Sequence, residues 1–107
     1  LAEVPLAATV DGQVVAGTVD RLLVTPDRIT IVDFKTARRP PSRLEEVPGG
    51  VLRQMGAYAA ALREIYPGRE VTAALLYTQV PILIPISADV LERNKPSYLG
   101  IQQTYPG

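Results

Sequence analysis

The sequence contains no cysteine and no histidine. Disulfide bonds, zinc sites of the Cys/His type, iron–sulfur clusters and catalysis by a thiol or by a serine–histidine pair are therefore excluded within these 107 residues. Any metal chemistry has to use oxygen ligands. Such ligands suit hard cations such as magnesium, manganese or calcium.

An excess of charge of one sign is also absent, because 11 lysines and arginines balance 11 aspartates and glutamates. The chain has no net positive charge that would attract nucleic acid, so a nucleic-acid partner has to bind a local patch of positive charge. No apolar run approaches the ~18 residues that a membrane-spanning helix needs, and nothing resembles a signal peptide. We therefore expect a soluble protein without a membrane partner, with the cytoplasm as the default compartment.

The length is that of one domain. A chain of 107 residues buries roughly two-thirds of its unfolded surface, and the 47% of apolar residues argue against disorder. A strand pattern begins close to Leu1, with no initiating methionine, so we interpret residues 1–107 as a single-domain fragment of a longer protein. Its core is expected over about residues 3–87. The tail, residues 94–107, shows no periodicity.

The pattern of apolar residues predicts an α+β fold: three antiparallel strands, one long helix, two further strands and a short helix. The predicted strands are 3–10, 13–24, 29–36, 70–78 and 82–86, and the last of them is expected at the edge of its sheet because Pro81 and Pro85 cannot donate to a ladder. The predicted helices are 51–66, with its apolar residues, Ile65 included, in a single buried stripe, and 87–93, with Ser87 as its cap. Residues 37–50 read as a loop. Gly17 interrupts the second strand, which indicates a bulge or the close approach of another backbone.

The third predicted strand carries apolar residues on both faces. Ile29 and Ile31 lie on one face, and Val32 and Phe34 lie on the other. This pattern predicts a central strand that is covered on both sides.

The same strand carries an acid and a base two residues apart, Asp33 and Lys35, which therefore project from one face. Centring the two hairpins on Asp11-Gly12 and on Pro26-Asp27 pairs Asp20 with Asp33, and Glu3 with Asp20. Like charges directly opposite each other destabilise a sheet. A row of three acids beside one lysine therefore indicates a divalent-metal site.

Three segments together resemble the RecB-type branch of the PD-(D/E)xK nuclease superfamily. They are residues 17–23 (GTVDRLL), 31–36 (IVDFKT) and 54–58 (QMGAY), which supply the ordered elements GxxDR, DFKT and QxxxY. More narrowly, the chain is similar to the C-terminal nuclease domain of AddA helicase–nuclease subunits over about residues 3 to 87. The resemblance implies a restriction-endonuclease-like core, α/β/α in character with a mixed sheet, and magnesium- or manganese-dependent hydrolysis of phosphodiester bonds.

Site roles follow from the same resemblance. Asp20 and Asp33 match metal-binding acids, and Lys35 matches the lysine that orients or activates the attacking water. Gln54 and Tyr58 match a helical pair that lines the site, and residues four apart do share a helix face. Valine stands where the superfamily name has proline. The family usually takes a further ligand, often histidine, from a helix upstream of the first strand, and this chain has neither.

Other residues keep two interpretations. Glu3 is either a third metal ligand or a structural residue of the first strand. Arg38, Arg39 and Arg43 are either an ordinary solvated loop or a flap that contacts DNA phosphates. Arg21, which is adjacent to Asp20, points to the opposite face.

Three functions remain open at this level. The first is the magnesium-dependent DNA exonuclease domain of a recombination and double-strand-break repair helicase–nuclease. Its partners are then DNA, the helicase portion of the same polypeptide and a second helicase–nuclease subunit. The second is a catalytically incomplete module for DNA binding or subunit docking. The third is a structural fragment that self-associates.

Overall fold

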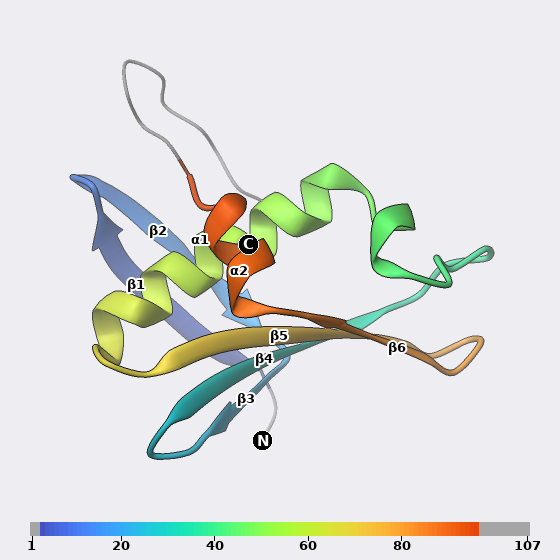
Figure 1. The fold of residues 1–107 in the computed structure, drawn as a ribbon, viewed down its shortest axis with the longest axis horizontal. Coiled ribbons are helices and arrows are strands. Elements are labelled where there is room, and N and C mark those ends of the chain that lie inside the picture. Colours follow the sequence, from blue (N-terminus) through green and yellow to red (C-terminus); the bar gives the residue numbers. More distant parts are fainter. Residues whose placement is uncertain (1–2, 97–107) are drawn as a thin grey trace.

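The computed structural model describes residues 3–96. Its first two strands, β1 (Val4–Val10) and β2 (Gln13–Val19), form an antiparallel hairpin that is a sheet of its own (Figure 1). Asp11 and Gly12 close this hairpin with φ angles of 48° and 81°. Positive φ at both central residues is what a two-residue primed turn requires, so the Asp-Gly dipeptide explains the tight connection.

The second sheet has four strands in the order β3-β4-β5-β6. The strands are β3 (Arg21–Val24), β4 (Arg28–Lys35), β5 (Glu70–Tyr77) and β6 (Ile82–Ile86). β4 and β5 run parallel, and the other two pairings are antiparallel. The predicted α+β architecture with a mixed sheet is confirmed and fits the expected restriction-endonuclease-like core. The predicted edge position of β6 is also confirmed.

The long helix connects the two parallel strands. α1 (Gly49–Ile65) begins two residues before the prediction, and Tyr66 caps its end. A parallel pair needs such a crossover, because a short turn cannot bring the chain back to the same end of the sheet.

One prediction about the strands is wrong. The expected second strand, 13–24, is broken at Asp20 into β2 and β3, so the first three strands do not form one sheet. The break coincides with a tertiary contact: the Asp20 carboxylate accepts a hydrogen bond from the backbone amide of Phe34, with an O–N distance of 2.8 Å. A side chain thus satisfies a backbone donor beside the break, and the chain bends there from the hairpin into the four-stranded sheet.

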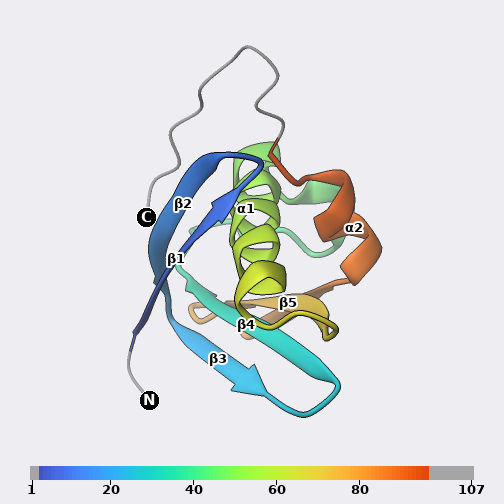
Figure 2. The same ribbon diagram turned by 90° about the vertical axis from the view of Figure 1, so that its left-hand side faces the viewer.

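α1 lies between the hairpin and the four-stranded sheet, with α2 (Ala88–Arg93) against its side (Figure 2). Every residue from Met55 through Leu62 is buried. A single apolar stripe was predicted, but the middle of the helix is enclosed on several sides. Ile65, predicted to belong to that stripe, is 43% exposed. The run of alanines at 57 and 59–61 allows this close packing, because small side chains let neighbouring elements approach.

Both helices lie on the same side of the four-stranded sheet (Figures 1 and 2). Ile29 and Ile31 of β4 are fully buried on that side, whereas Phe34 on the other face is 41% exposed. The central position of this strand is confirmed. Within residues 3–96, however, the predicted cover on its second face is absent, and Leu23 and Leu83 are exposed there too.

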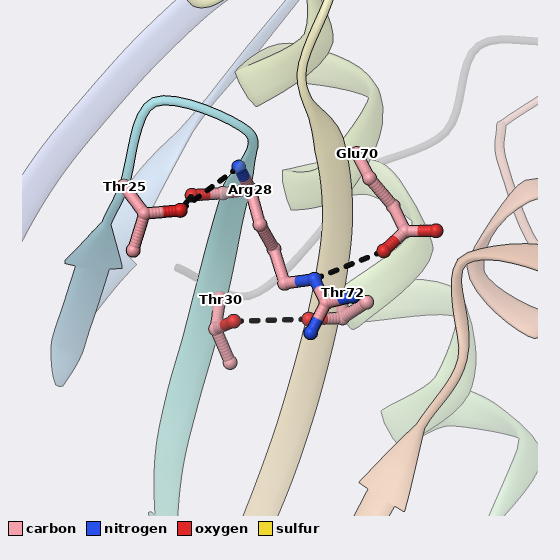
Figure 3. A network of polar contacts seen from close by, with 5 residues as sticks. All are labelled: Thr25, Arg28, Thr30, Glu70 and Thr72. Carbon is pink, nitrogen blue, oxygen red and sulfur yellow. Dashed lines mark hydrogen bonds and ion pairs between the residues drawn. The ribbon is translucent and has the colours of Figure 1, made fainter.

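A polar network ties the first residues of β4 to those of β5 on the open face (Figure 3). The Thr30 and Thr72 hydroxyls hydrogen bond at 3.0 Å, and Arg28 Nε lies 2.9 Å from Glu70 Oε1. The ion pair is half exposed and contributes little free energy by itself. Together the two contacts hold the parallel register, and that register decides what lies beside Lys35 at the far end of the strand.

The remaining elements are short. A 3₁₀ turn, η1 (Leu44–Glu46), lies in the segment predicted to be an irregular loop. The predicted cap of the last helix is confirmed, because the Ser87 side chain accepts a hydrogen bond from the Val90 amide. The tail predicted to lack periodicity, residues 94–107, falls mostly outside the described residues. Within residues 3–96 no helix is long and apolar enough to cross a membrane.

Candidate active site

Asp33 and Lys35 end β4 on the face that α1 covers. The Lys35 ammonium lies 2.9 Å from Asp33 Oδ2, and the two side chains are only 27% and 15% exposed. The predicted placement of both residues on one face is therefore what the structure has. Two residues of spacing in an extended strand suffice to bring the acid and the base into contact.

Asp20 reaches the same place from the bend between β2 and β3. The β3–β4 ladder begins at Arg21 and Val32, so its register is the one that pairs Asp20 with Asp33. The hydrogen bond from the Phe34 amide holds one Asp20 oxygen beside the end of β4. Burial is the main reason that the pKa of Asp33 is raised, and the nearby negative charge of Asp20 adds to the rise. The structure thus brings the two predicted aspartates together.

The Asp33 carboxylate is held in unfavourable surroundings. Burial raises its pKa above the ordinary value, Lys35 opposes this shift, and Asp20 adds to it. Oδ2 is enclosed, and the Lys35 ammonium at 2.9 Å is its compensating contact. A carboxylate of this kind is stabilised by an added positive charge.

A metal ion fits this donor set only in part. Magnesium is commonly held by one or two carboxylates, with water and substrate phosphate oxygens completing its shell. Asp20 and Asp33 supply two carboxylates with one enclosed oxygen available. Among residues 3–96 no group of three acidic side chains lies close enough to hold a metal ion.

The predicted row of three acids is therefore wrong. Glu3 is exposed and precedes β1, whose hairpin ends its ladder at Val4 and Val19, one residue short of Glu3 and Asp20. The chain then bends at Asp20 toward the other sheet. The predicted pairing register is correct in both hairpins, but the prediction of the row also assumed that the two hairpins form one continuous sheet.

Gln54 and Tyr58 approach the acids from α1. Gln54 Nε2 donates to the Tyr58 hydroxyl at 3.4 Å, and Tyr58 is only 1% exposed. Burial raises the pKa of Tyr58, the Gln54 hydrogen bond lowers it, and the charges of Asp33 and Lys35 act on it in opposite directions. The predicted helical pair thus lies within electrostatic reach of the acid–base pair.

Gly17 explains how Tyr58 fits. A Cβ atom at this position would lie 2.7 Å from Cε1 of the Tyr58 ring and closer still to its hydroxyl, so only glycine leaves room. The register of β1 and β2 is unbroken, which excludes the predicted bulge. The close approach predicted at Gly17 does occur, but it comes from a side chain rather than from a backbone.

The three loop arginines are exposed. Arg43 forms an ion pair with Glu46 across the short 3₁₀ turn, with an N–O distance of 3.5 Å. Arg38 and Arg39 follow β4 directly, so they leave the same end of the sheet as Lys35. Within the described residues none of the three forms an ion pair with Asp20 or Asp33.

Sequence analysis missed Tyr77 as a neighbour of the site. It lies beside Lys35 in the parallel register, is 4% exposed, and experiences the charges of both Lys35 and Asp33. The order of the elements could have indicated it, because the two strands of a strand–helix–strand segment usually run parallel and side by side. The predicted two further strands were given no direction, so their partners remained open.

Comparison with known proteins agrees with this geometry. The family model of the PD-(D/E)XK nuclease superfamily matches residues 2–101. No curated protein and no solved structure gives a significant match. The family match spans nearly the whole chain and includes every residue of the acid–base site. The chain therefore belongs to the PD-(D/E)XK nuclease superfamily, whose fold is that of a nuclease-type phosphodiesterase acting on DNA.

Proposed function

We propose that this chain is a metal-dependent DNA exonuclease domain that hydrolyses phosphodiester bonds. The observation that carries the proposal is the enclosed Asp33 Oδ2, which contacts the Lys35 ammonium at 2.9 Å and belongs to a carboxyl group whose pKa is raised by burial and further by Asp20. A structural ion pair on a surface does not require a partly buried carboxylate with a raised pKa. Such groups are common where a site has to bind a cation and act on a substrate.

Asp20 and Asp33 are the proposed ligands of a magnesium or manganese ion. When bound, a divalent cation makes water a better nucleophile at neutral pH and offsets the charge of the phosphate. Within the described residues only two acids lie close together at this site. The other ligands of the metal therefore have to come from water, substrate and other groups.

Lys35 is the proposed electrostatic and water-orienting group. Its ammonium is tethered to Asp33 and retains 27% side-chain exposure, so it can reach a phosphate oxygen without leaving the site. A fixed positive charge where negative charge develops is worth more in a partly dry site than in water.

Gln54 and Tyr58 shape the wall of the site from α1. Tyr58 is too enclosed to contact DNA broadly, and its proposed role is to hold α1 and β2 around the acids. Arg38 and Arg39, with Arg43, are proposed to contact phosphates along the path of the DNA. Their exposure and their position in the loop that follows β4 support this role.

The finer assignment rests on the motif resemblance. GxxDR, DFKT and QxxxY in this order are typical of the RecB-type branch, and the extended similarity points to AddA-type helicase–nucleases. We therefore propose a cytoplasmic enzyme of double-strand-break repair and recombination. Its partners are the helicase portion of the same polypeptide and a second helicase–nuclease subunit.

One observation favours a second candidate. With only two acids together in residues 3–96, the domain lacks a third protein carboxylate for the metal. A module that binds DNA or docks a subunit without cleavage needs no such ligand. The retention of Asp20, Asp33 and Lys35 in one cluster supports the enzyme over this alternative.

Cleavage of linear DNA with magnesium tests the proposal. We expect activity in the wild-type chain and its loss in Asp33→Ala. Asp27→Ala, an exposed acid at the opposite end of β4, is the matched control and should retain activity. If the isolated chain is inactive, the same pair is tested in the longer helicase–nuclease. Full nuclease activity of Asp33→Ala in that protein would exclude the enzyme assignment.

A further inference from the structure

Tyr77, the last residue of β5, lies directly beside Lys35, the last residue of β4. Both side chains belong to the face that α1 covers, because Tyr77 alternates in step with the buried Val71, Ala73 and Leu75. Adjacent strands are roughly 5 Å apart, so these two side chains are immediate neighbours. This adjacency is a consequence of the parallel register.

The ring of Tyr77 is held firmly in place. The residue is only 4% exposed. Just beyond it, the Thr78 amide donates to the Lys35 carbonyl at 3.1 Å, and the Thr78 hydroxyl reaches the same oxygen at 3.4 Å. The backbone of Lys35 is therefore tied to β5 at the point where Tyr77 meets it.

The hydroxyl of Tyr77 differs from the ring. Within residues 3–96 no hydrogen bond of this hydroxyl is seen, and it is not among the enclosed side-chain atoms that lack a partner. The Tyr77 hydroxyl thus keeps access to solvent at the edge of the site. Burial raises the pKa of Tyr77, Lys35 lowers it and Asp33 raises it, so the hydroxyl stays protonated at neutral pH and can donate.

We propose that Tyr77 is a substrate-binding residue whose hydroxyl donates a hydrogen bond to a non-bridging oxygen of the phosphate held beside Lys35. This inference rests on the proposed function, since it needs a DNA phosphate at the acid–base pair. A neutral donor on a rigid ring complements the flexible lysine: the lysine supplies charge, and the tyrosine restricts orientation. Tyrosine hydroxyls are regular donors to DNA phosphates.

Tyr77→Phe removes the hydroxyl and keeps the ring that fills the core. We expect an unchanged Tm, an affinity for a fluorescein-labelled linear DNA duplex about tenfold weaker, and a KM raised by a similar factor with little change in kcat. Fluorescence anisotropy without metal and cleavage with magnesium measure the two effects. Tyr66→Phe is the matched control, since Tyr66 stacks against Arg69 at the far end of α1 and should change neither.

The outcomes separate the two proposals. If Asp33→Ala is inactive while Tyr77→Phe binds and cleaves like wild type, the tyrosine contact is rejected and the enzyme stands. Weaker binding by Tyr77→Phe, together with full activity of Asp33→Ala in the longer helicase–nuclease, supports the contact and rejects catalysis. A wild-type chain that does not bind the duplex rejects the contact, and full activity of Asp33→Ala in the longer protein then rejects the enzyme as well. A Tyr77→Phe variant with a lowered Tm and an unchanged KM shows a structural role only.

Discussion

At the scale of single residues, Asp33 shows a conflict between stability and function. Its side chain is 15% exposed, its enclosed Oδ2 depends on the Lys35 ammonium for compensation, and its pKa is raised chiefly by burial. A fully exposed aspartate would cost less free energy of folding. The same surroundings prepare the oxygen to accept a cation, because an added positive charge relieves the desolvation that folding imposes.

Asp33→Asn tests this conflict in the metal-free protein. Because the folded-state pKa of Asp33 is raised above 3.8, the folded state binds the proton more tightly than the unfolded state. The stability contributed by the protonated group is lost as the pH rises through the folded-state pKa. The Tm of the variant minus that of wild type should therefore be more positive at about pH 7 than at about pH 4.

Thermal unfolding with a chelator present measures this difference. Added manganese should then raise the Tm of wild type but not that of Asp33→Asn. A Tm difference that does not depend on pH, or an equal response of both proteins to manganese, would contradict the interpretation of Asp33.

At the scale of elements, the contact between β2 and α1 sets the position of the helix over the acids. Tyr58 lies where a side chain at position 17 would otherwise be, and its hydroxyl is hydrogen bonded by Gln54 and by the backbone of Thr18. The ring of Tyr58 is therefore one point where the hairpin contacts the helix that carries part of the site. α1 also packs against α2 and against the four-stranded sheet.

Gly17→Ala should disturb this contact. The added methyl overlaps the Tyr58 ring, and such overpacking costs about 1–3 kcal/mol of unfolding free energy. We expect a lower denaturation midpoint in urea and reduced cleavage, since Tyr58 has to shift.

Gly50→Ala is the matched control. It lies in the first turn of α1, where the nearest atom to an added methyl is the flexible end of Arg53 at 3.8 Å. A small gain in stability is expected from helix propensity. Equal effects of the two substitutions would argue against the packing role of Gly17.

At the scale of the whole molecule, the balanced charge means that DNA affinity has to come from a local surface. The net charge is zero at neutral pH. The loop arginines Arg38, Arg39 and Arg43 lie close in sequence to the carboxyl end of β4. The opposite face of the sheet exposes apolar side chains instead, among them Leu23, Phe34 and Leu83. The proposed DNA surface is thus confined to the end of the sheet that carries the acids.

Replacing Arg38 and Arg39 together by alanine should weaken DNA binding at every sequence. Each phosphate contact contributes about one to the slope of log affinity against log salt, so the slope should fall by about two. Anisotropy over a range of salt concentrations measures it. Arg93→Ala, an exposed arginine at the end of α2, should leave the slope unchanged. An unaltered slope in the double variant would remove the two loop arginines from the DNA surface.

The sequence by itself determined the elements and the hairpin registers. The pattern of apolar residues identified β5 and β6, the Asp-Gly dipeptide identified the first turn, and Ser87 identified the start of α2. These features depend on contacts a few residues apart, so local chemistry is enough. The spacing of Asp33 and Lys35, and the pairing register that brings Asp20 to them, are local in the same sense.

Only the tertiary structure decided how the elements combine. The break at Asp20 depends on a hydrogen bond to Phe34, fourteen residues away, which no local pattern encodes. That break separated Glu3 from the site by ending the common sheet. The parallel pairing of β4 with β5 brought in Tyr77 from forty-two residues along the chain, as the register pair of Lys35. The burial of Asp33, and with it the case for a cation site, likewise arises because distant elements close over the end of one strand.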